Sequence, residues 1–226
     1  MTAAANEDGG DSEKSRFRCL DAARYVVAAA VTVLILAVIV TAIKVVLRLD
    51  SLQISVHNRS INTIPIMSPP EPEAALVLEL QLRGENPSGR VRMYYLNITA
   101  YLFDNTTSAS ASTDPESDSV LFFKLPKDIA VLQQEAVDSS LNTNPPVKKN
   151  MMDPLYFDML YNGSRFSDMT LRLDGNLVTE VTSEFNRTRP TTYYCEQLLV
   201  GGNPNDDASK SSEDVVCKQQ RSAAPP

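Results

Sequence analysis

The segment ALVLELQLR, residues 75–83, decides the fold class because its apolar and polar residues alternate along the chain. Every second residue from Leu76 to Leu82 is a leucine, and polar residues, Glu79 and Gln81, stand between the later ones. In an extended chain, successive side chains point to opposite faces of a sheet. The segment therefore predicts a β-strand with one buried face and one solvated face.

Six further segments are predicted as strands. They are Leu52–Val56, Arg90–Asp104, Val120–Leu125, Met169–Leu173, Leu177–Phe185 and Tyr193–Val200. Turn-forming residues at Asn86–Gly89 predict a strand connection, and those at Asp174–Asn176 predict a hairpin turn. We expect a polar loop at Ser108–Ser119 and one short helix around Ile129–Val137. About seven short strands predict an all-β fold, a β-sandwich.

One apolar run stands apart from this pattern. Tyr25–Ile43 contains 19 residues without a charge. As a helix it would rise about 28 Å, which matches a bilayer core of roughly 30 Å. We therefore predict a transmembrane helix over residues 25–47, with the lipid bilayer as its partner. The alternative is a cleaved signal peptide, whose apolar region usually has only about 7–15 residues.

The flanking charges predict the direction of the span. Four basic residues precede it and two follow it closely: Lys14, Arg16, Arg18 and Arg24, then Lys44 and Arg48. The positive-inside rule places the more basic flank in the cytosol. We expect residues 1–24 to form a disordered cytosolic tail, residues 48–202 an extracellular β-domain, and residues 203–226 a disordered tail.

Potential modification sites agree with this topology. Five N-glycosylation motifs all follow the span, at Asn58, Asn97, Asn105, Asn162 and Asn186. Cys19 precedes the span, where a thiol is either a candidate for palmitoylation or simply free. Cys195 and Cys217 are the two cysteines on the oxidising side and can pair.

The segment ENPSGRVRMYY, residues 85–95, resembles the NPN-x-x-x-G-x-x-YY signature of the plant NDR/HIN-like family, which carries a group 2 late-embryogenesis-abundant domain. The matching residues are Asn86, Pro87, Gly89, Tyr94 and Tyr95. Ser88 replaces the second Asn of the signature, and Leu96 replaces the Asp that often follows the tyrosines. The segment Tyr193–Val200 is similar to the family's last strand with its single cysteine.

This resemblance implies a fibronectin-III-like or immunoglobulin-like β-sandwich at the plasma membrane and a role in pathogen or dehydration responses. The proline-rich motif of the best-known defence members is not apparent around residues 60–70. The resemblance therefore supports family membership more than a defence role. We expect the protein to act by contact with another protein or with cell-wall material.

Composition and motifs argue against several other functions. A net charge of −7 disfavours a nucleic-acid binder, which needs a basic footprint. The single histidine, His57, is predicted to lie in a surface loop, and no catalytic constellation accompanies it. Type II glycosyltransferases share the topology, but their D-x-D motif is absent. We expect no enzyme activity and no cofactor.

The acidic residues do not form a metal motif. The segment Asp114–Asp118 resembles the start of a calcium loop, yet Ser119 and Leu125 stand where an EF-hand needs Gly and Glu. We interpret this segment and Asp206–Asp207 as solvated acidic stretches and expect no metal.

A different class of function is a binding module for an apolar ligand, such as lipid held between the sheets. The run Val120–Phe123 allows this but equally suits a dry core. The chain after residue 48 has 15 basic and 23 acidic residues, a balance of −8, which disfavours contact with anionic headgroups.

Overall fold

The computed structural model describes residues 11–47, 51–68, 73–182, 185–202 and 213–220. The chain separates into two compact units, Met1–Leu49 and Asp50–Pro226. The first unit contains the helix α1 (Asp11–Leu47), and the second contains all the described strands. The boundary agrees with the sequence, because the apolar run ends just before the alternating segments begin.

Helix α1 carries an apolar stretch of 20 residues, Ala23–Ala42, with a mean hydropathy of 2.7 and no residue buried by the chain. Its length and composition suit a membrane span or a signal sequence. The hydroxyls of Thr32 and Thr41 donate to the carbonyls of Ala28 and Ala37, each at 2.8 Å. These polar groups are therefore satisfied within the helix, as an apolar environment requires.

The prediction of a disordered tail over residues 1–24 is wrong for Asp11–Arg24, which belong to α1. This segment contains neither proline nor glycine. Extending an existing helix needs no new nucleation step. The helix formed by the apolar stretch can therefore continue into the residues before it. Residues 1–10 of the predicted tail lie outside the described residues.

The second unit is built from eleven described strands and three short helices. The strands are β1 (Gln53–Ser68), β2 (Glu73–Glu85), β3 (Arg92–Phe103), β4 (Leu121–Lys124), β5 (Ile129–Val131), β6 (Ala136–Asn142), β7 (Val147–Lys148), β8 (Arg165–Thr182), β9 (Phe185–Gly201), β10 (Val215–Val216) and β11 (Lys218–Gln220). The helices are α2 (Pro115–Asp118), η1 (Lys149–Met151) and α3 (Pro154–Tyr161).

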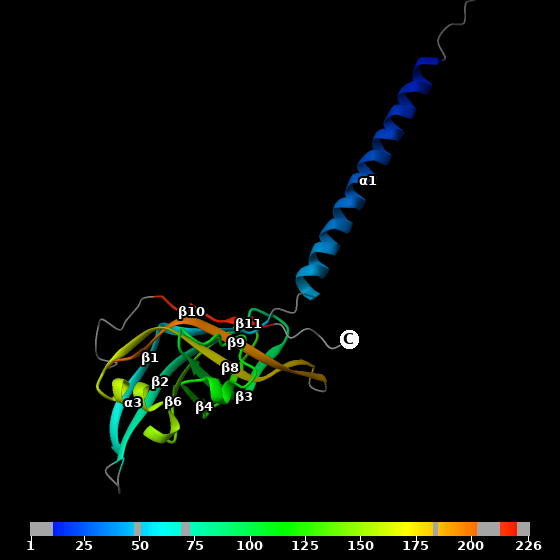
Figure 1. Ribbon diagram of the computed structural model, residues 1–226. Helices are drawn as coiled ribbons and strands as arrows, with labels where there is room; N and C mark the ends of the chain where they lie inside the picture. Colours follow the sequence, from blue (N-terminus) through cyan, green and yellow to red (C-terminus); the bar gives the residue numbers. More distant parts are fainter. Residues whose placement is uncertain (1–10, 48–50, 69–72, 183–184, 203–212, 221–226) are drawn as a thin grey trace, which may run out of the picture. The chain divides into compact units, whose positions relative to one another are not determined.

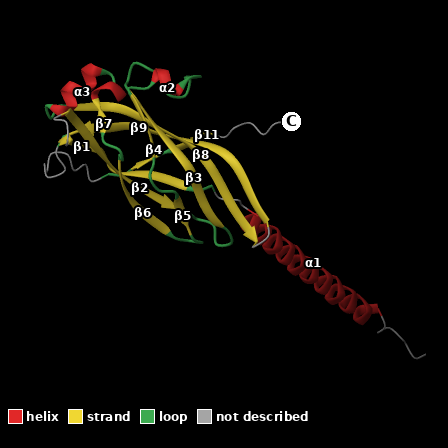
Figure 2. Ribbon diagram, turned by 90° about the horizontal axis from the view of Figure 1, so that it is seen from below, coloured by secondary structure: helices red, strands yellow, loops and turns green. Residues whose placement is uncertain are grey.

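Seven strands form a continuous path in the order β4-β3-β8-β9-β1-β2-β6, and four short strands pair beside it. Among the described strands, the pairings are antiparallel except for β1–β9, where Ser60 and Ile61 pair with Leu199 and Val200 in parallel. This short parallel contact joins one layer, β4-β3-β8-β9, to another, β1-β2-β6, and the sheet curls between them (Figures 1 and 2). The predicted all-β, sandwich-like fold is confirmed.

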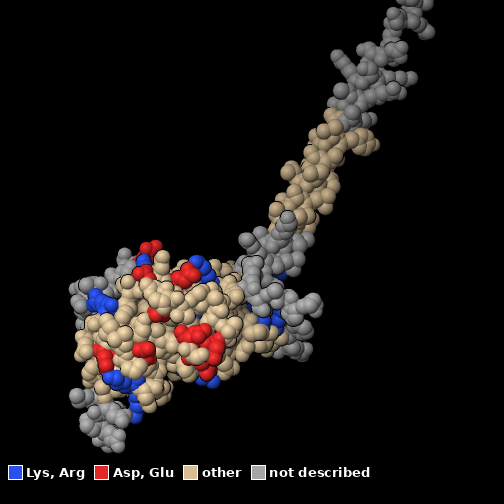
Figure 3. All heavy atoms as spheres, viewed as in Figure 1, with Lys and Arg blue, Asp and Glu red and all other residues tan. Residues whose placement is uncertain are grey.

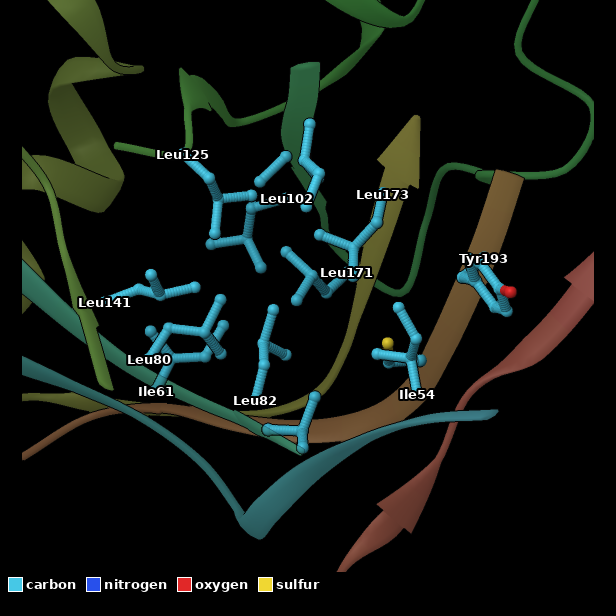
Figure 4. Packing of buried hydrophobic residues seen from close by; sticks show 14 of the residues in the cluster. Ile54, Ile61, Leu80, Leu82, Leu102, Leu125, Leu141, Leu171, Leu173 and Tyr193 are labelled. Atoms are coloured by element: carbon cyan, nitrogen blue, oxygen red, sulfur yellow. The ribbon is translucent and has the colours of Figure 1, made fainter. Parts of the chain in front are cut away.

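The core lies between the two layers. The four leucines of β2 that alternate from Leu76 to Leu82 are at most 1% exposed, as the sequence pattern predicted. Leu80, Leu82 and neighbouring side chains face Leu102 and Leu171 across the interior (Figure 4). At about 25 cal/mol per Å² of buried apolar surface, such leucines supply the main stabilisation of the fold.

The predicted hairpin turn at Asp174–Asn176 is wrong, because β8 runs through these residues and pairs with β9 as far as Thr182. Gly175 lies against the ring of Tyr95, where an added Cβ would come within 2.9 Å of Cε2. Glycine inside a strand often marks such a close approach. Gly175 therefore makes room for an aromatic ring and does not form a turn.

The predicted helix around Ile129–Val137 is also wrong, since this segment forms β5 and the start of β6. Ile129 and Val131 are buried and Ala130 is exposed, which is the period of two that a strand requires. The predicted polar loop at Ser108–Ser119 is present, and it contains the single turn of α2.

Helix α3 was not expected from the sequence. The side chain of Asp153 accepts a hydrogen bond from the backbone N–H of Leu155 at 2.8 Å, and Pro154 occupies the first turn. An aspartate followed by proline before an apolar run is a helix-start signal. Phe157 and Leu160 of α3 are buried in the core, and their packing makes so short a helix stable.

The predicted disordered tail over residues 203–226 is wrong for residues 213–220, which we call the strap. Val216 of β10 pairs with Ser55 of β1, and Lys218 of β11 pairs with Tyr194 of β9. The strap thus pairs with β1 on one side and with β9 on the other. The polar composition of this segment predicted disorder, but backbone pairing with β1 and β9 orders the strap. The rest of the predicted tail lies outside the described residues.

Candidate functional site

The turn that carries the expected family signature is built into the fold. Asn86 is completely buried; its Nδ2 donates to the carbonyl of Val91 at 2.7 Å, and its Oδ1 accepts the N–H of Ser88 at 3.0 Å. The amide thereby closes the turn that contains Pro87 and Gly89. Buried polar groups are costly unless they are hydrogen-bonded, so we interpret Asn86 as a structural residue.

Tyr94 and Tyr95 point to opposite faces of β3, as their adjacency in a strand predicted. The Tyr95 hydroxyl donates to the carbonyls of Leu173 at 2.8 Å and Thr191 at 2.9 Å. The Tyr94 hydroxyl, on the other face, donates to Glu180 Oε2 at 2.9 Å. The tyrosine pair therefore ties β3 to β8 and β9 from both sides.

Tyr95 meets Tyr193 of β9 in the core, with ring centroids 5.3 Å apart and an edge-to-face geometry. The Tyr193 hydroxyl donates to the carbonyl of Leu52 at 2.7 Å. Burial is the largest cause that raises the pKa of both hydroxyls above the usual value. Both tyrosines are thus neutral donors that link strands.

The other face of the layer β4-β3-β8-β9 carries a row of side chains that are in register across the strands. This outer row consists of Phe122, Tyr101, Arg172, Tyr194 and Lys218. The guanidinium carbon of Arg172 lies 6.0 Å from the ring centroid of Tyr101 and 5.8 Å from that of Tyr194. These distances suit cation–π contacts on both sides of the arginine.

An ion pair completes the charge arrangement of the outer row. Arg172 Nη2 lies 2.9 Å from Asp174 Oδ2. Burial by itself lowers the pKa of Arg172, but the hydrogen bond to Asp174 and its charge outweigh burial and raise this pKa. Burial also raises the pKa of Tyr101 and of Tyr194. At neutral pH the row therefore presents a fixed cation between two neutral phenols.

The loop between β3 and β4 folds onto the outer row. Arg172 Nη1 donates to the carbonyls of Ala109 and Ser112, each at 3.2 Å. Ala109 is buried in a small cluster with Tyr101 and Tyr194, separate from the main core. The aromatic and cationic side chains therefore hold a polar loop in one position on the outer face.

Asp104 anchors the start of this loop. Its carboxylate accepts the backbone N–H groups of Thr106 at 3.1 Å and Thr107 at 3.0 Å, and the hydroxyl of Tyr156 at 2.9 Å. Burial by itself raises the pKa of Asp104, but hydrogen bonds from Thr106 and Tyr156 outweigh burial and lower it. The carboxylate therefore stays charged and links the loop to α3.

Four of the five predicted glycosylation sites are exposed: Asn97, Asn105, Asn162 and Asn186. Asn58 is half-buried in β1, and its backbone N–H donates to Asp214 Oδ1 at 3.0 Å. The four exposed side chains leave room for a glycan, and the attachment of glycans to any of the five stays a prediction.

Cys195 and Cys217 form a disulfide with an S–S distance of 2.07 Å. The bond joins β9 to the strap, where the Cys217 N–H also donates to the carbonyl of Ile54 at 2.8 Å. Beside it, Lys218 Nζ pairs with Glu196 Oε2 at 2.5 Å. The side chain of Cys19, the predicted palmitoylation site, lies outside the described residues.

The prediction that His57 lies in a loop is wrong, because it belongs to β1. Strand β1 is irregular between Val56 and Ile61, and this bulge explains the loop-like sequence. His57 Nδ1 lies 2.9 Å from Asp214 Oδ1 of the strap. The histidine therefore helps to dock the strap.

The acidic residues of the polar loop bond within the loop. Asp114 accepts the hydroxyl of Ser117 at 2.8 Å, and Asp118 accepts the hydroxyl of Ser112 at 2.9 Å. Over the described part of the chain, no group of three or more His, Cys, Asp or Glu side chains is arranged to hold a metal ion. Asp206–Asp207 lie outside the described residues.

Comparison with known proteins gave structural likenesses alone. No family model matches the chain, and no curated protein matches its sequence. A crystal structure of a protein from Archaeoglobus fulgidus is similar over 66% of this chain and 95% of its own, at 9% identity and a TM-score of 0.27. The solution structure of AT1g01470 from Arabidopsis thaliana is similar over 70% of this chain and 90% of its own, at 11% identity and a TM-score of 0.33. At these TM-scores, neither structure carries an argument about the function of this chain.

Proposed function

We propose that the chain is a non-catalytic, single-pass membrane protein with a cytosolic N-terminus and an extracellular β-domain that acts by contact. The single observation that carries this proposal is the apolar stretch Ala23–Ala42. None of it is buried by the chain, and large side chains such as Val26 and Leu34 are 68% and 65% exposed. Apolar surface of this size is stable only when something else covers it, and a bilayer does so.

The finer part of the proposal is membership of the NDR/HIN-like family and a role in plant defence or abiotic stress at the plasma membrane. Its support is the signature turn from Asn86 to Tyr95 and the order of one span followed by a β-domain. The partner is another protein or cell-wall material. Acidic and basic side chains are interspersed on the face in view in Figure 3, which suits polar contact rather than binding to a polyanion.

Topology is the first test. The full chain, tagged at its C-terminus, would be synthesised with sealed microsomes and treated with protease from outside. We expect the β-domain to be protected and to lose mass with an endoglycosidase. Removal of the sequons one at a time, for example by Asn97→Gln and Asn186→Gln, would identify the occupied sites.

Two results would contradict the proposal. One is a β-domain that is digested in sealed microsomes and carries no glycan. The other is a chain that alkaline carbonate extracts from the membrane, since a cleaved signal sequence would leave a soluble product. A charge-reversed variant with Arg16→Glu and Arg18→Glu is the control, because the positive-inside rule predicts that it weakens the orientation.

The alternative proposal is an apolar ligand held between the layers, which the apolar run Val120–Phe123 allows. Leucine, isoleucine and tyrosine side chains face one another across the interior (Figure 4). This packing stabilises the domain by itself, so contact through the outer surface is the better proposal.

A further inference from the structure

Strand β6 lies at one end of the described sheet. Within the described ranges, β2 is the strand that pairs with β6, over seven residue pairs from Glu79–Asn142 to Glu85–Ala136. One edge of β6 is therefore free of a strand partner in the described structure. The side chains of Ala136, Asp138, Ser140 and Asn142 are exposed.

Proteins usually protect such an edge against pairing with other chains. Proline, lysine, a bulge or a covering element are the common means. Strand β6 contains no proline, lysine or arginine, and its pairing with β2 has no irregularity. Its one charged residue, Asp138, has a side chain that is 77% exposed. The Oδ1 atom of Asp138 lies 3.8 Å from Nη1 of Arg83 in β2. The free edge of β6 is therefore regular and lacks the usual protecting residues, so its backbone can pair with another strand.

The sequence of β6 suits pairing with a second copy of itself. Its odd-numbered residues Val137, Ser139 and Leu141 lie on the core side, because they pair with Gly84, Leu82 and Leu80. In an antiparallel pair, directly opposite residues share a face. A two-fold axis must therefore pass beside a single residue of β6, so that odd residues oppose odd residues.

The charge and the apolar residues select one register. An axis beside Asp138 would oppose two aspartates directly, which is destabilising. An axis beside Ser140 would leave Ala136 and Val137 without opposite residues in β6. An axis beside Ser139 opposes Val137 to the partner's Leu141 on the core side and Asp138 to the partner's Ser140 on the outer side. It keeps all seven residues paired and places no like charges opposite each other.

We propose that two copies of this chain associate through β6, antiparallel and centred on Ser139, so that the layer β1-β2-β6 continues into the partner. The interface is isologous, as a two-fold dimer requires. One strand pair buries less surface than a stable dimer of soluble proteins, which needs more than about 1,000 Å². The association therefore rests on the proposed membrane anchorage, because confinement to one bilayer raises the effective concentration of the edge.

Cysteine cross-linking tests the register directly. In a Cys19→Ser background, Ser139→Cys would place two thiols opposite each other, at the Cα separation of about 4.5–5.5 Å that a disulfide accepts. Ser140→Cys is the matched control, because its opposite residue is Asp138 of the other copy. Membranes that contain the full-length variants would be treated with copper–phenanthroline, which takes two electrons from the paired thiols, and run on a non-reducing gel.

We expect Ser139→Cys to give several-fold more covalent dimer than Ser140→Cys. In the Ser139→Cys chain, Ser140→Asp should reduce the dimer because it opposes the partner's Asp138, whereas Asn142→Asp should not because it opposes Ala136. Equal cross-linking at positions 139 and 140, or none at either, overturns the proposal. A different adduct at position 139 would show that the edge takes another chain and overturns it as well.

Two further measurements keep the test decisive. Protection of Cys195 and Cys217 from alkylation before reduction shows that each variant has folded, so that absence of a dimer counts against the pairing. Carbonate extraction of the same membranes reports anchorage separately. Extraction of the chain by carbonate would contradict the proposed function. The amount of covalent dimer of Ser139→Cys relative to that of Ser140→Cys tests the β6 pairing separately.

Discussion

The two faces of strands β3, β8 and β9 use tyrosine in different ways. On the inner face, Tyr95 and Tyr193 pack edge to face, and their hydroxyls donate to backbone carbonyls. On the outer face, Tyr101 and Tyr194 enclose the charged side chain of Arg172. A dry core needs a backbone acceptor for each hydroxyl, whereas a face near solvent can hold a charge. The inner pair therefore joins strands, and the outer pair holds a loop.

The largest difference between the faces should appear in alkaline solution. Burial raises the pKa of Tyr95 and Tyr193, whereas tyrosines of the unfolded chain have a pKa of about 10. Above that pH the unfolded state releases protons that the folded state keeps, so stability that is complete below pH 10 is lost as the pH rises. The loss should be about 1.4 kcal/mol per pH unit for each buried tyrosine, or about 3 kcal/mol for two.

Denaturant unfolding of the full chain in detergent, repeated across this pH range, would measure the slope. The double variant with Tyr95→Phe and Tyr193→Phe should flatten it. The matched outer variant with Tyr101→Phe and Tyr194→Phe should keep most of the slope of unfolding free energy against pH. Equal slopes in the two double variants would show that the faces do not differ in this way.

A second comparison truncates one tyrosine of the adjacent pair in β3. Tyr95→Ala removes a completely buried ring and should lower the free energy of unfolding by about 3–5 kcal/mol. Tyr94→Ala removes a half-buried ring on the other face and should cost about 1 kcal/mol, mainly its hydrogen bond to Glu180. A cost at position 94 that equals the cost at 95 would contradict the assignment of faces.

A smaller effect is expected from single hydroxyls of β9. Tyr193→Phe leaves the buried carbonyl of Leu52 without this donor and should cost about 1–2 kcal/mol. Tyr194→Phe loses a bond to Gln220, which is exposed to water, and should cost about 0.5 kcal/mol. Denaturant midpoints of the two variants would give the order, and a reversed order would count against it.

The smallest effect on global stability should follow from the outer arginine. Arg172→Lys keeps the charge but loses the planar fork that reaches Ala109 and Ser112. We expect unfolding to change by about 1 kcal/mol or less, while the loop amides of Ala111 and Ser112 exchange hydrogen faster. Unchanged exchange in Arg172→Lys would mean that the loop does not depend on the arginine.

Several features of the fold were predictable because they depend on residues that are close together in the sequence. The alternation from Leu76 to Leu82 identified a buried strand face, and the adjacency of Tyr94 and Tyr95 identified their opposite directions. The capping signal at Asp153–Pro154, which begins α3, is also contained in two adjacent residues. The turn predicted at Gly175 is wrong because a glycine that forms a turn and one that accommodates a ring look alike in a sequence.

The candidate site was not predictable, because its members come from five strands. Tyr101 and Lys218 lie 117 positions apart in the sequence, yet they belong to one row. The five glycosylation motifs and the two paired cysteines were visible from the sequence. Their neighbours, such as Asp214 beside His57 and Asn58, were not.

The sequence by itself determined which segments are apolar, which face of β2 and of β3 is buried, and where the membrane helix candidate lies. These properties depend on the helical and strand periods, which act over a few residues. Tertiary structure alone decided which strands are neighbours, that the strap returns to β1 and β9, and that Arg172 lies between two tyrosines. Packing across the core sets the register of distant strands, so the rows that carry the candidate surfaces exist only in the folded chain.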